Sequence, residues 1–234
     1  MKKTQILMFV AGLILASNVV ATGLQVSPVS LTTPASKSSS IIHVSNASDK
    51  PLQAQIRVFS WRQAENKDVL EETSQIIASP PFVTLEPGTK QLVRLVRTSP
   101  AAQAEEANYR LIVDELPIPD QIQKGINLNL RYSIPLRISG KDVAALKPIV
   151  DVIWTIDSGL VTVSIKNDSE VRAQIGTIRL STKLNTVNLS TGLVGYVLPK
   201  STMEWKFSVK DLDIDAQSLT INVDGEPVQF QKKI

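Results

Sequence analysis

The side chains that could carry out chemistry are few and widely separated. His43 is the only histidine, the chain has no cysteine, and His43 stands between Ile42 and Val44 in an alternating segment. Without thiols or a second histidine, the zinc sites that these ligands build are excluded. A serine–histidine–aspartate arrangement stays open as an alternative, although no local nucleophile motif accompanies it. The pattern favours a structural His43 and a protein that is not an enzyme.

The carboxylates favour a binding protein in the same way. Adjacent glutamates at 71–72 and 105–106 stand in polar segments, where a solvated surface is the expected role. In the segment DLDID, residues 211–215, three aspartates alternate and could present one carboxylate face to calcium. The ligand spacing and the glycine of an EF-hand are missing. We therefore expect no metal and no cofactor.

The N-terminus has the pattern of a secretory signal peptide. Lys2 and Lys3 precede an apolar run over residues 6–16, and small residues lead up to Ala21. A membrane-spanning helix needs about 20 apolar residues, and this run is shorter. We therefore set residues 1–21 apart as a signal peptide cleaved near Ala21. The remaining chain is expected to be exported, with no insertion into a membrane.

The charge balance gives no sign of a nucleic-acid partner. The formal net charge is +3, and Lys2 and Lys3 of the signal segment account for two of these charges. No basic stripe with interleaved aromatic residues is present. Since there are no cysteines for disulfides, stability must come from a hydrophobic core, and 43% of the residues are hydrophobic.

Alternation with a period of two residues runs along most of the chain and predicts β-strands. Turn residues such as Glu-Pro-Gly at 86–88 separate these runs, and only 101–110 suggests a turn or two of helix. The alternating runs cover residues 40–46, 52–61, 90–97, 109–117, 125–138, 160–167, 203–209 and 218–223. Short strands with turns between them predict an all-β fold of two immunoglobulin-like sandwiches.

The domain boundary is expected in a polar, glycine-containing segment. This segment reads SGKDVAALKP, residues 139–148. We place an N-terminal immunoglobulin-like domain at 22–138, a linker at 139–147 and a C-terminal domain at 148–234. The sequence GINLNLRYSIPLRI would then be the last strand of the first domain.

That last strand alternates without a slip between an apolar and a polar face. An ordinary surface strand would turn its apolar face to its own core. A terminal strand is also an edge strand, whose free N–H and C=O groups can pair with another chain while alternate side chains fill pockets in it. The side chains that would do so are Ile126, Leu128, Leu130, Tyr132 and Ile134.

Three segments resemble the periplasmic pilus-assembly chaperones of the chaperone–usher pathway. They are IIHVSNASDKPLQAQIRVFSW, IIASPPFVTLEPGTKQLVRLV and YRLIVDELP, which occur in the family's order within residues 24–138. The resemblance implies a boomerang of two immunoglobulin-like domains that works in the periplasm. It implies that the last strand of the first domain completes a pilus subunit by donor-strand complementation, and that the subunit passes to an outer-membrane usher.

One departure from the family concerns the anchor for the subunit's terminal carboxylate. Pro28 and Pro135 stand near the positions where the well-studied branch has an arginine and a lysine. Prolines at these positions resemble the archaic branch of the family. Arg110 is placed to replace them, because the start of its strand lies beside the end of the donor strand. Arg137 is the second candidate, with pairing to Glu106 to fix the angle between the domains as its alternative role.

Other classes of function remain as alternatives. A pilus subunit or adhesin made of immunoglobulin-like domains is the main one, although such subunits usually lack the last strand that is present here. A hydrolase on a sandwich scaffold would need a catalytic site that the sequence does not reveal. Self-association through the exposed edge strand is also left open as a partner for the free chain.

Overall fold

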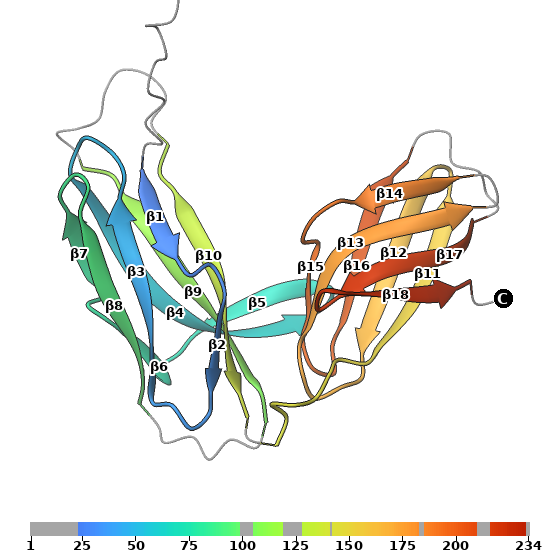
Figure 1. The fold of residues 1–234 in the computed structure, drawn as a ribbon, viewed down its shortest axis with the longest axis horizontal. Coiled ribbons are helices and arrows are strands. Elements are labelled where there is room, and N and C mark those ends of the chain that lie inside the picture. The colour runs from blue at the N-terminus through green and yellow to red at the C-terminus, as the bar shows by residue number, and fades with distance from the viewer. Residues whose placement is uncertain are drawn as a thin grey trace, which may run out of the picture.

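The computed structural model describes residues 23–98, 105–118, 128–140, 142–182, 185–209 and 216–232. Within these ranges every regular element is a strand, and the strands form two sandwiches that meet at an angle (Figure 1). The predicted all-β fold class is confirmed. No helix in the described part has the length and apolarity needed to cross a bilayer. The expected signal segment 1–21, Ile126 and the aspartates of 211–215 lie outside the described residues.

The N-terminal sandwich consists of two facing sheets. One sheet has the order β1-β3-β8-β6, and the other has the order β2-β10-β9-β4-β5, with β7 also paired to β4. The strands are β1 (Leu24–Ser27), β2 (Leu31–Pro34), β3 (Ser39–Asn46), β4 (Leu52–Ala64), β5 (Lys67–Glu72), β6 (Ile76–Ser79), β7 (Phe82–Leu85), β8 (Lys90–Arg97), β9 (Ala107–Leu116) and β10 (Arg131–Ser139).

Alternation along these strands builds the core between the two sheets. In β9, Leu111 and Val113 are fully buried with Ile42 of β3 and Val93 of β8, while Ile112 between them is buried outside this core cluster. Burying one such aliphatic side chain is worth about 1.5–3 kcal/mol, which is why the alternating segments fold as strands. The candidate helix at 101–110 is wrong in its described end, because β9 begins at Ala107.

The C-terminal sandwich repeats this plan with fewer strands. A sheet of order β11-β12-β16 faces one of order β14-β13-β17-β18, and β15 also pairs with β13. The strands are β11 (Val150–Asp157), β12 (Leu160–Asn167), β13 (Ala173–Thr182), β14 (Thr186–Ser190), β15 (Gly195–Val197), β16 (Thr202–Ser208), β17 (Ala216–Val223) and β18 (Glu226–Gln231). Its core is separate, and Val163, Ile165 and Ile178 are fully buried in it.

The same buried asparagine motif closes a strand in each sandwich. Asn46 at the end of β3 donates to the carbonyls of Lys50 and Leu85 at 2.8 and 2.9 Å. Asn167 at the end of β12 donates to the carbonyls of Val171 and Val197 at 2.8 and 2.9 Å. In both cases a serine two residues later donates its backbone N–H and its hydroxyl to the asparagine Oδ1. Each asparagine therefore satisfies backbone carbonyls that would otherwise be buried without a donor.

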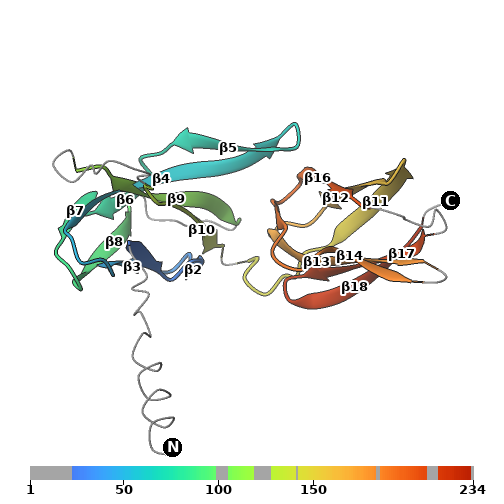
Figure 2. The same cartoon turned by 90° about the horizontal axis from the view of Figure 1, so that it is seen from above.

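The long hairpin of β4 and β5 extends from the first sandwich to the second, as both views show (Figures 1 and 2). The side-chain amide of Gln63 on β4 donates to the carbonyl of Tyr196, 2.9 Å away, and accepts from the backbone N–H of Leu198, also at 2.9 Å. Trp61 packs with the same two residues in a small buried cluster. The hairpin thus contacts the second sandwich at a junction formed by Trp61, Gln63, Tyr196 and Leu198.

Candidate functional site

The last strand of the first sandwich is an edge over half of its length. Residues Arg131–Ile138 of β10 pair with β9, and Leu136–Ser139 also pair in parallel with β2. Among the strands that the structure describes, none pairs with the other side of residues 131–135. An open strand edge is therefore present where the sequence predicts one, although β10 begins at Arg131 rather than near residue 126.

The backbone along this edge is arranged for pairing. The N–H of Glu115 on the β9 side donates to the carbonyl of Leu130 at 2.8 Å, which makes these two residues a hydrogen-bonded pair. Because such pairs alternate in an antiparallel ladder, the backbone groups of Arg131 and Ser133 point away from β9. Pro135 points the same way and has no N–H to leave unpaired, which is the setting in which a strand tolerates proline.

Two of the expected donor side chains are exposed just before this edge. Leu128 is 80% exposed and Leu130 is 38% exposed. The expectation that Ile134 is a donor side chain is wrong, because Ile134 is only 2% exposed and belongs to the core of its own sandwich. Tyr132 also packs against that core, and its hydroxyl donates to the carbonyl of Leu24 at 2.8 Å. The apolar side chains of this segment are thus exposed at Leu128 and Leu130, and they pack into the core of their own sandwich from Tyr132 onward.

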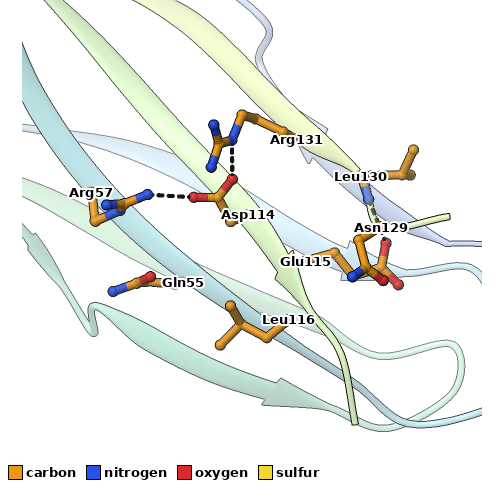
Figure 3. Close-up of a pocket in the computed structure, with 8 residues that line it drawn as sticks. All are labelled: Gln55, Arg57, Asp114, Glu115, Leu116, Asn129, Leu130 and Arg131. Atoms are coloured by element: carbon orange, nitrogen blue, oxygen red, sulfur yellow. Dashed lines mark hydrogen bonds and ion pairs between the residues drawn. The ribbon is translucent and has the colours of Figure 1, made fainter. Parts of the chain in front are cut away.

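A buried carboxylate fixes the start of β10. Asp114 on β9 accepts hydrogen bonds from Arg57 on β4, at 2.7 Å, and from Arg131 (Figure 3). The three side chains line a pocket of about 400 Å³ beside Leu130. Burial alone would raise the pKa of Asp114, but the hydrogen bonds and charges of Arg131 and Arg57 outweigh it and hold that pKa below its usual value.

Arg110 lies at the junction, as expected, and it is already paired. Its guanidinium stacks on the ring of Trp61, with the Cζ 3.7 Å from the centroid. Its Nη2 lies 3.2 Å from Oδ2 of Asp68 on β5, and its side chain is 13% exposed. Burial lowers the pKa of Arg110, while the charge and hydrogen bond of Asp68 raise it. Arg110 remains a cation at any ordinary pH, because the unperturbed pKa of arginine is so high.

Arg172 is the residue of this site that the sequence analysis missed. It precedes β13 in the second sandwich and is only 5% exposed. Its Cζ lies 4.6 Å from the ring centroid of Tyr196 and 6.0 Å from that of Trp61. Burial lowers the pKa of Arg172, and the charges of Arg137 and Arg110 act in the same direction, while Tyr196 and Glu106 raise it. No sequence pattern marks Arg172, since only tertiary packing brings it to Trp61.

Several buried polar atoms at the junction have no hydrogen-bond partner within the described residues. Three are donors, namely Nε1 of Trp61, Nε of Arg137 and Nη1 of Arg172, and one is the acceptor Oδ1 of Asn108. Buried polar groups are nearly always hydrogen-bonded in folded proteins, so these atoms can pair with ordered water or with a ligand group. The excess of donors favours a group that only accepts, such as a carboxylate.

Glu106 organises the base of this cluster. Its side chain has no exposed surface, and its Oε2 lies 3.4 Å from Nη1 of Arg137. Its Oε1 accepts from Nδ2 of Asn108 and from the backbone N–H of Arg172, each at 2.9 Å. The expected pair of Glu106 and Arg137 is thus present, but both residues belong to the first sandwich. Glu106 links the two halves through the hydrogen bond that it accepts from the backbone N–H of Arg172, in addition to the hydrogen bonds of Gln63.

The remaining sequence expectations have simple positions in the structure. Pro28 lies between β1 and β2, after a cis peptide bond with Ser27, and Pro135 stands opposite Arg110 in the β9–β10 register. His43 lies on the outward side of β3, between Ser27 of β1 and Leu92 of β8. In the part of the chain that the structure describes, no group of three potential ligands gathers to hold a metal ion.

Comparison with known proteins identifies the family. The family model of pili and flagellar-assembly chaperones, PapD N-terminal domain, matches residues 23–143. The chain belongs to this family. The match covers the whole N-terminal sandwich, including the β10 edge and Arg110, and it confirms the resemblance expected from the sequence. A search of curated proteins found no match.

Solved structures of pilus chaperones share the two-sandwich fold. A chain in the pre-assembly complex of the chaperone CsuC with the tip adhesion subunit CsuE, from the archaic Csu pili of Acinetobacter baumannii, is 26% identical with a TM-score of 0.69, over 91% of this chain and 100% of that one. The CupB2 chaperone of Pseudomonas aeruginosa is 19% identical with a TM-score of 0.58, over 90% and 100%. A chain in the complex of the SafA pilin with the SafB chaperone of Salmonella enterica is 14% identical with a TM-score of 0.59, over 90% and 96%.

Proposed function

We propose that this pilus chaperone binds an incomplete pilus subunit by lending it the β10 edge as a donor strand. The subunit is then capped in the periplasm until an outer-membrane usher takes it. The observation that carries the proposal is the open edge at residues 131–135 with the exposed Leu128 and Leu130 leading into it. In a related pair, the chaperone CsuC is found in a pre-assembly complex with the subunit CsuE.

The geometry of the edge supports strand donation. A partner strand that pairs with Arg131 and Ser133 gains main-chain hydrogen bonds, which depend little on sequence. The aliphatic side chains before the edge then enter the groove that a missing strand leaves in the subunit, and Ile126 belongs to the same alternating set. Each buried leucine contributes about 1.5–3 kcal/mol. Because Ile134 and Tyr132 are used in the chaperone's own core, we limit the donor set to Ile126, Leu128 and Leu130.

The junction supplies the second part of the proposed binding site. A strand that pairs along the open edge ends near Pro135, where β2 begins to pair with β10, and Arg110 lies opposite Pro135 in the β9–β10 register. Arginine binds a carboxylate through two parallel hydrogen bonds, so the terminal carboxylate of the subunit is a suitable ligand for it. Arg137 is less suited, because its partner Glu106 has no exposed surface and is held by two further hydrogen bonds, whereas Asp68, the partner of Arg110, is 40% exposed. We therefore assign the anchor to Arg110 first.

The substitution Leu128→Asp tests the donor strand. At 80% exposure, Leu128 supports no core, so the variant is expected to fold normally and to lose the recovery of a co-expressed pilus subunit by about tenfold or more. Ile153→Asp on β11 is the matched control, because Ile153 is an exposed aliphatic residue, 54% exposed, on the other sandwich. The measurement is the amount of subunit that co-purifies from a periplasmic extract.

Two outcomes would count against the proposal. If Leu128→Asp protects the subunit as well as the unaltered chain does, the segment before β10 is not the donor. If Ile153→Asp fails to the same extent, the loss reflects a general effect of a surface charge. Sedimentation of the free chain at increasing concentration separately tests whether the edge pairs with a second copy, and Leu128→Asp should then abolish that pairing.

A further inference from the structure

The cation proposed as the anchor already has a carboxylate partner from its own chain. Asp68 lies on β5, two residues beyond the hairpin tip, where Glu65 and Asn66 both have positive φ angles of 52° and 60°. Its Oδ2 is 3.2 Å from Nη2 of Arg110, and its side chain is 40% exposed while that of Arg110 is 13% exposed. The hairpin thus places the partly exposed carboxylate of Asp68 against the largely buried guanidinium of Arg110.

The structure around Asp68 does not depend on this ion pair. The other carboxylate oxygen of Asp68 accepts from Nε2 of Gln63 at 2.9 Å. Gln63 is held independently by its hydrogen bonds to the backbone of Tyr196 and Leu198 in the second sandwich. A rotation of the Asp68 side chain away from Arg110 therefore leaves the contact between hairpin and second sandwich in place.

The junction offers an incoming carboxylate more than Asp68 uses. Nη1 of Arg172 and Nε1 of Trp61 are buried donors without a partner in the described chain, and both residues are at least 95% buried. The guanidinium groups of Arg110 and Arg172 contact the same two rings, those of Trp61 and Tyr196. Burial lowers the pKa of Arg172, and the charges of Arg137 and Arg110 act in the same direction while Tyr196 and Glu106 oppose them, so an anion placed between Arg110 and Arg172 would offset the repulsion among these cations.

We propose that Asp68 is an intramolecular stand-in for the terminal carboxylate of a subunit. In the free chain it occupies Arg110, and it gives way when that carboxylate binds between Arg110 and Arg172. This inference rests on the proposed function of the β10 edge and deepens it, because it adds a competing group that regulates the same site.

A stand-in of this kind would make the site selective. A small anion in bulk solution has to compete with Asp68 for Arg110. Asp68 has the advantage, because a group on the same chain is present at a high effective concentration. A carboxylate at the end of a strand already paired along β10 arrives at a comparable effective concentration. It also gains the donors of Arg172 and Trp61 that Asp68 leaves unused. The site therefore prefers a carboxylate at the end of a strand that is already paired with β10 over a free anion.

The substitution Asp68→Asn tests this role. Asparagine keeps an acceptor oxygen for Gln63 but removes the charge that holds Arg110. The matched control is Glu71→Gln on the same strand, because it removes the same charge from a different ion pair. Glu71 pairs with Arg62, and the side chains of both residues are 55% exposed. The probe is a synthetic peptide of alternating valine and threonine residues, prepared with a free C-terminal carboxylate and as its C-terminal amide. Calorimetry measures the affinity of each form for the full chain and its variants.

The expected result is specific to one variant and one peptide form. Asp68→Asn should bind the free-acid peptide about threefold to fivefold more tightly than the unaltered chain does, as befits the loss of one partly exposed ion pair, with no change for the amide. Glu71→Gln should change neither affinity. If Asp68→Asn and Glu71→Gln behave alike while the unaltered chain still prefers the free acid, Asp68 is no stand-in and only this inference fails. If the unaltered chain binds acid and amide equally, the carboxylate anchor of the proposed function fails as well.

Discussion

Arg110 lies directly across from Pro135 in the antiparallel pair of β9 and β10. Side chains of directly opposed residues share one face of a sheet, so the guanidinium emerges beside a position that offers no donor of its own. The cation at the end of the edge thus comes from the neighbouring strand rather than from the edge strand. Stacking on Trp61 then fixes its direction toward the junction.

The substitution Arg110→Gln should remove the preference for a free carboxylate. A hydrogen bond to a charged group contributes about 1.5–3 kcal/mol, so the free-acid peptide should bind at least tenfold more weakly while the amide is unaffected. Calorimetry with both peptide forms checks this. Arg62→Gln is the matched control, since Arg62 is an arginine of the same hairpin with a 55% exposed side chain. An equal loss for acid and amide would show that Arg110 only supports the fold of the junction.

The substitution Asp114→Asn should loosen the start of β10 in a pH-dependent way. The pKa of Asp114 is held below its usual value by Arg131 and Arg57, so its ionised form stabilises the folded chain. This contribution is fully present above the unfolded pKa of about 3.9, and it is lost as the pH falls through the lower folded pKa. Because the side chains of Arg57 and Arg131 are 42% and 66% exposed, we expect a cost of about 1 kcal/mol at pH 7.

Urea unfolding at pH 7 and at pH 3 measures this difference. The gap in free energy of unfolding between Asp114→Asn and the unaltered chain should shrink at the lower pH. A gap that stays constant would mean that the ion pairs contribute nothing and that the asparagine merely packs worse. Asp157→Asn at the end of β11 is a suitable comparison, because it removes an exposed carboxylate from the other sandwich.

The two asparagine motifs should prove equally important, each for its own sandwich. Asn46→Ala and Asn167→Ala each leave two backbone carbonyls without their donor, at positions that are 2% and 0% exposed. We expect each to lower the free energy of unfolding of its sandwich by about 2–3 kcal/mol. Calorimetric melting should show one transition shifting in each variant. Asn188→Ala, at an exposed position of β14, should leave both transitions unchanged, and a comparable shift there would contradict the role of the motif.

The strands and their inward faces followed from alternation, but the extent of the edge did not. Leu128, Leu130 and Ile134 have the same parity in one regular segment, and nothing in the pattern separates them. The pairing of β2 with Leu136–Ser139 and the packing of β1 beneath Tyr132 decide where the segment stops being free. A period of two reports which side a residue faces, whereas the presence of a neighbour on that side depends on distant parts of the chain.

The junction shows the same division. The sequence by itself determined two all-β sandwiches, an edge strand ending at the boundary, and a cation on β9 beside a proline, because strand periodicity and antiparallel order are local rules. Only the tertiary structure decided that Arg172 joins Arg110 on the rings of Trp61 and Tyr196, that Asp68 pairs with Arg110, and that Glu106 binds the second sandwich through a backbone N–H. These contacts join residues on five separate segments of the chain. The packing of the β4–β5 hairpin on the second sandwich brings these segments together, and no local sequence pattern predicts that packing.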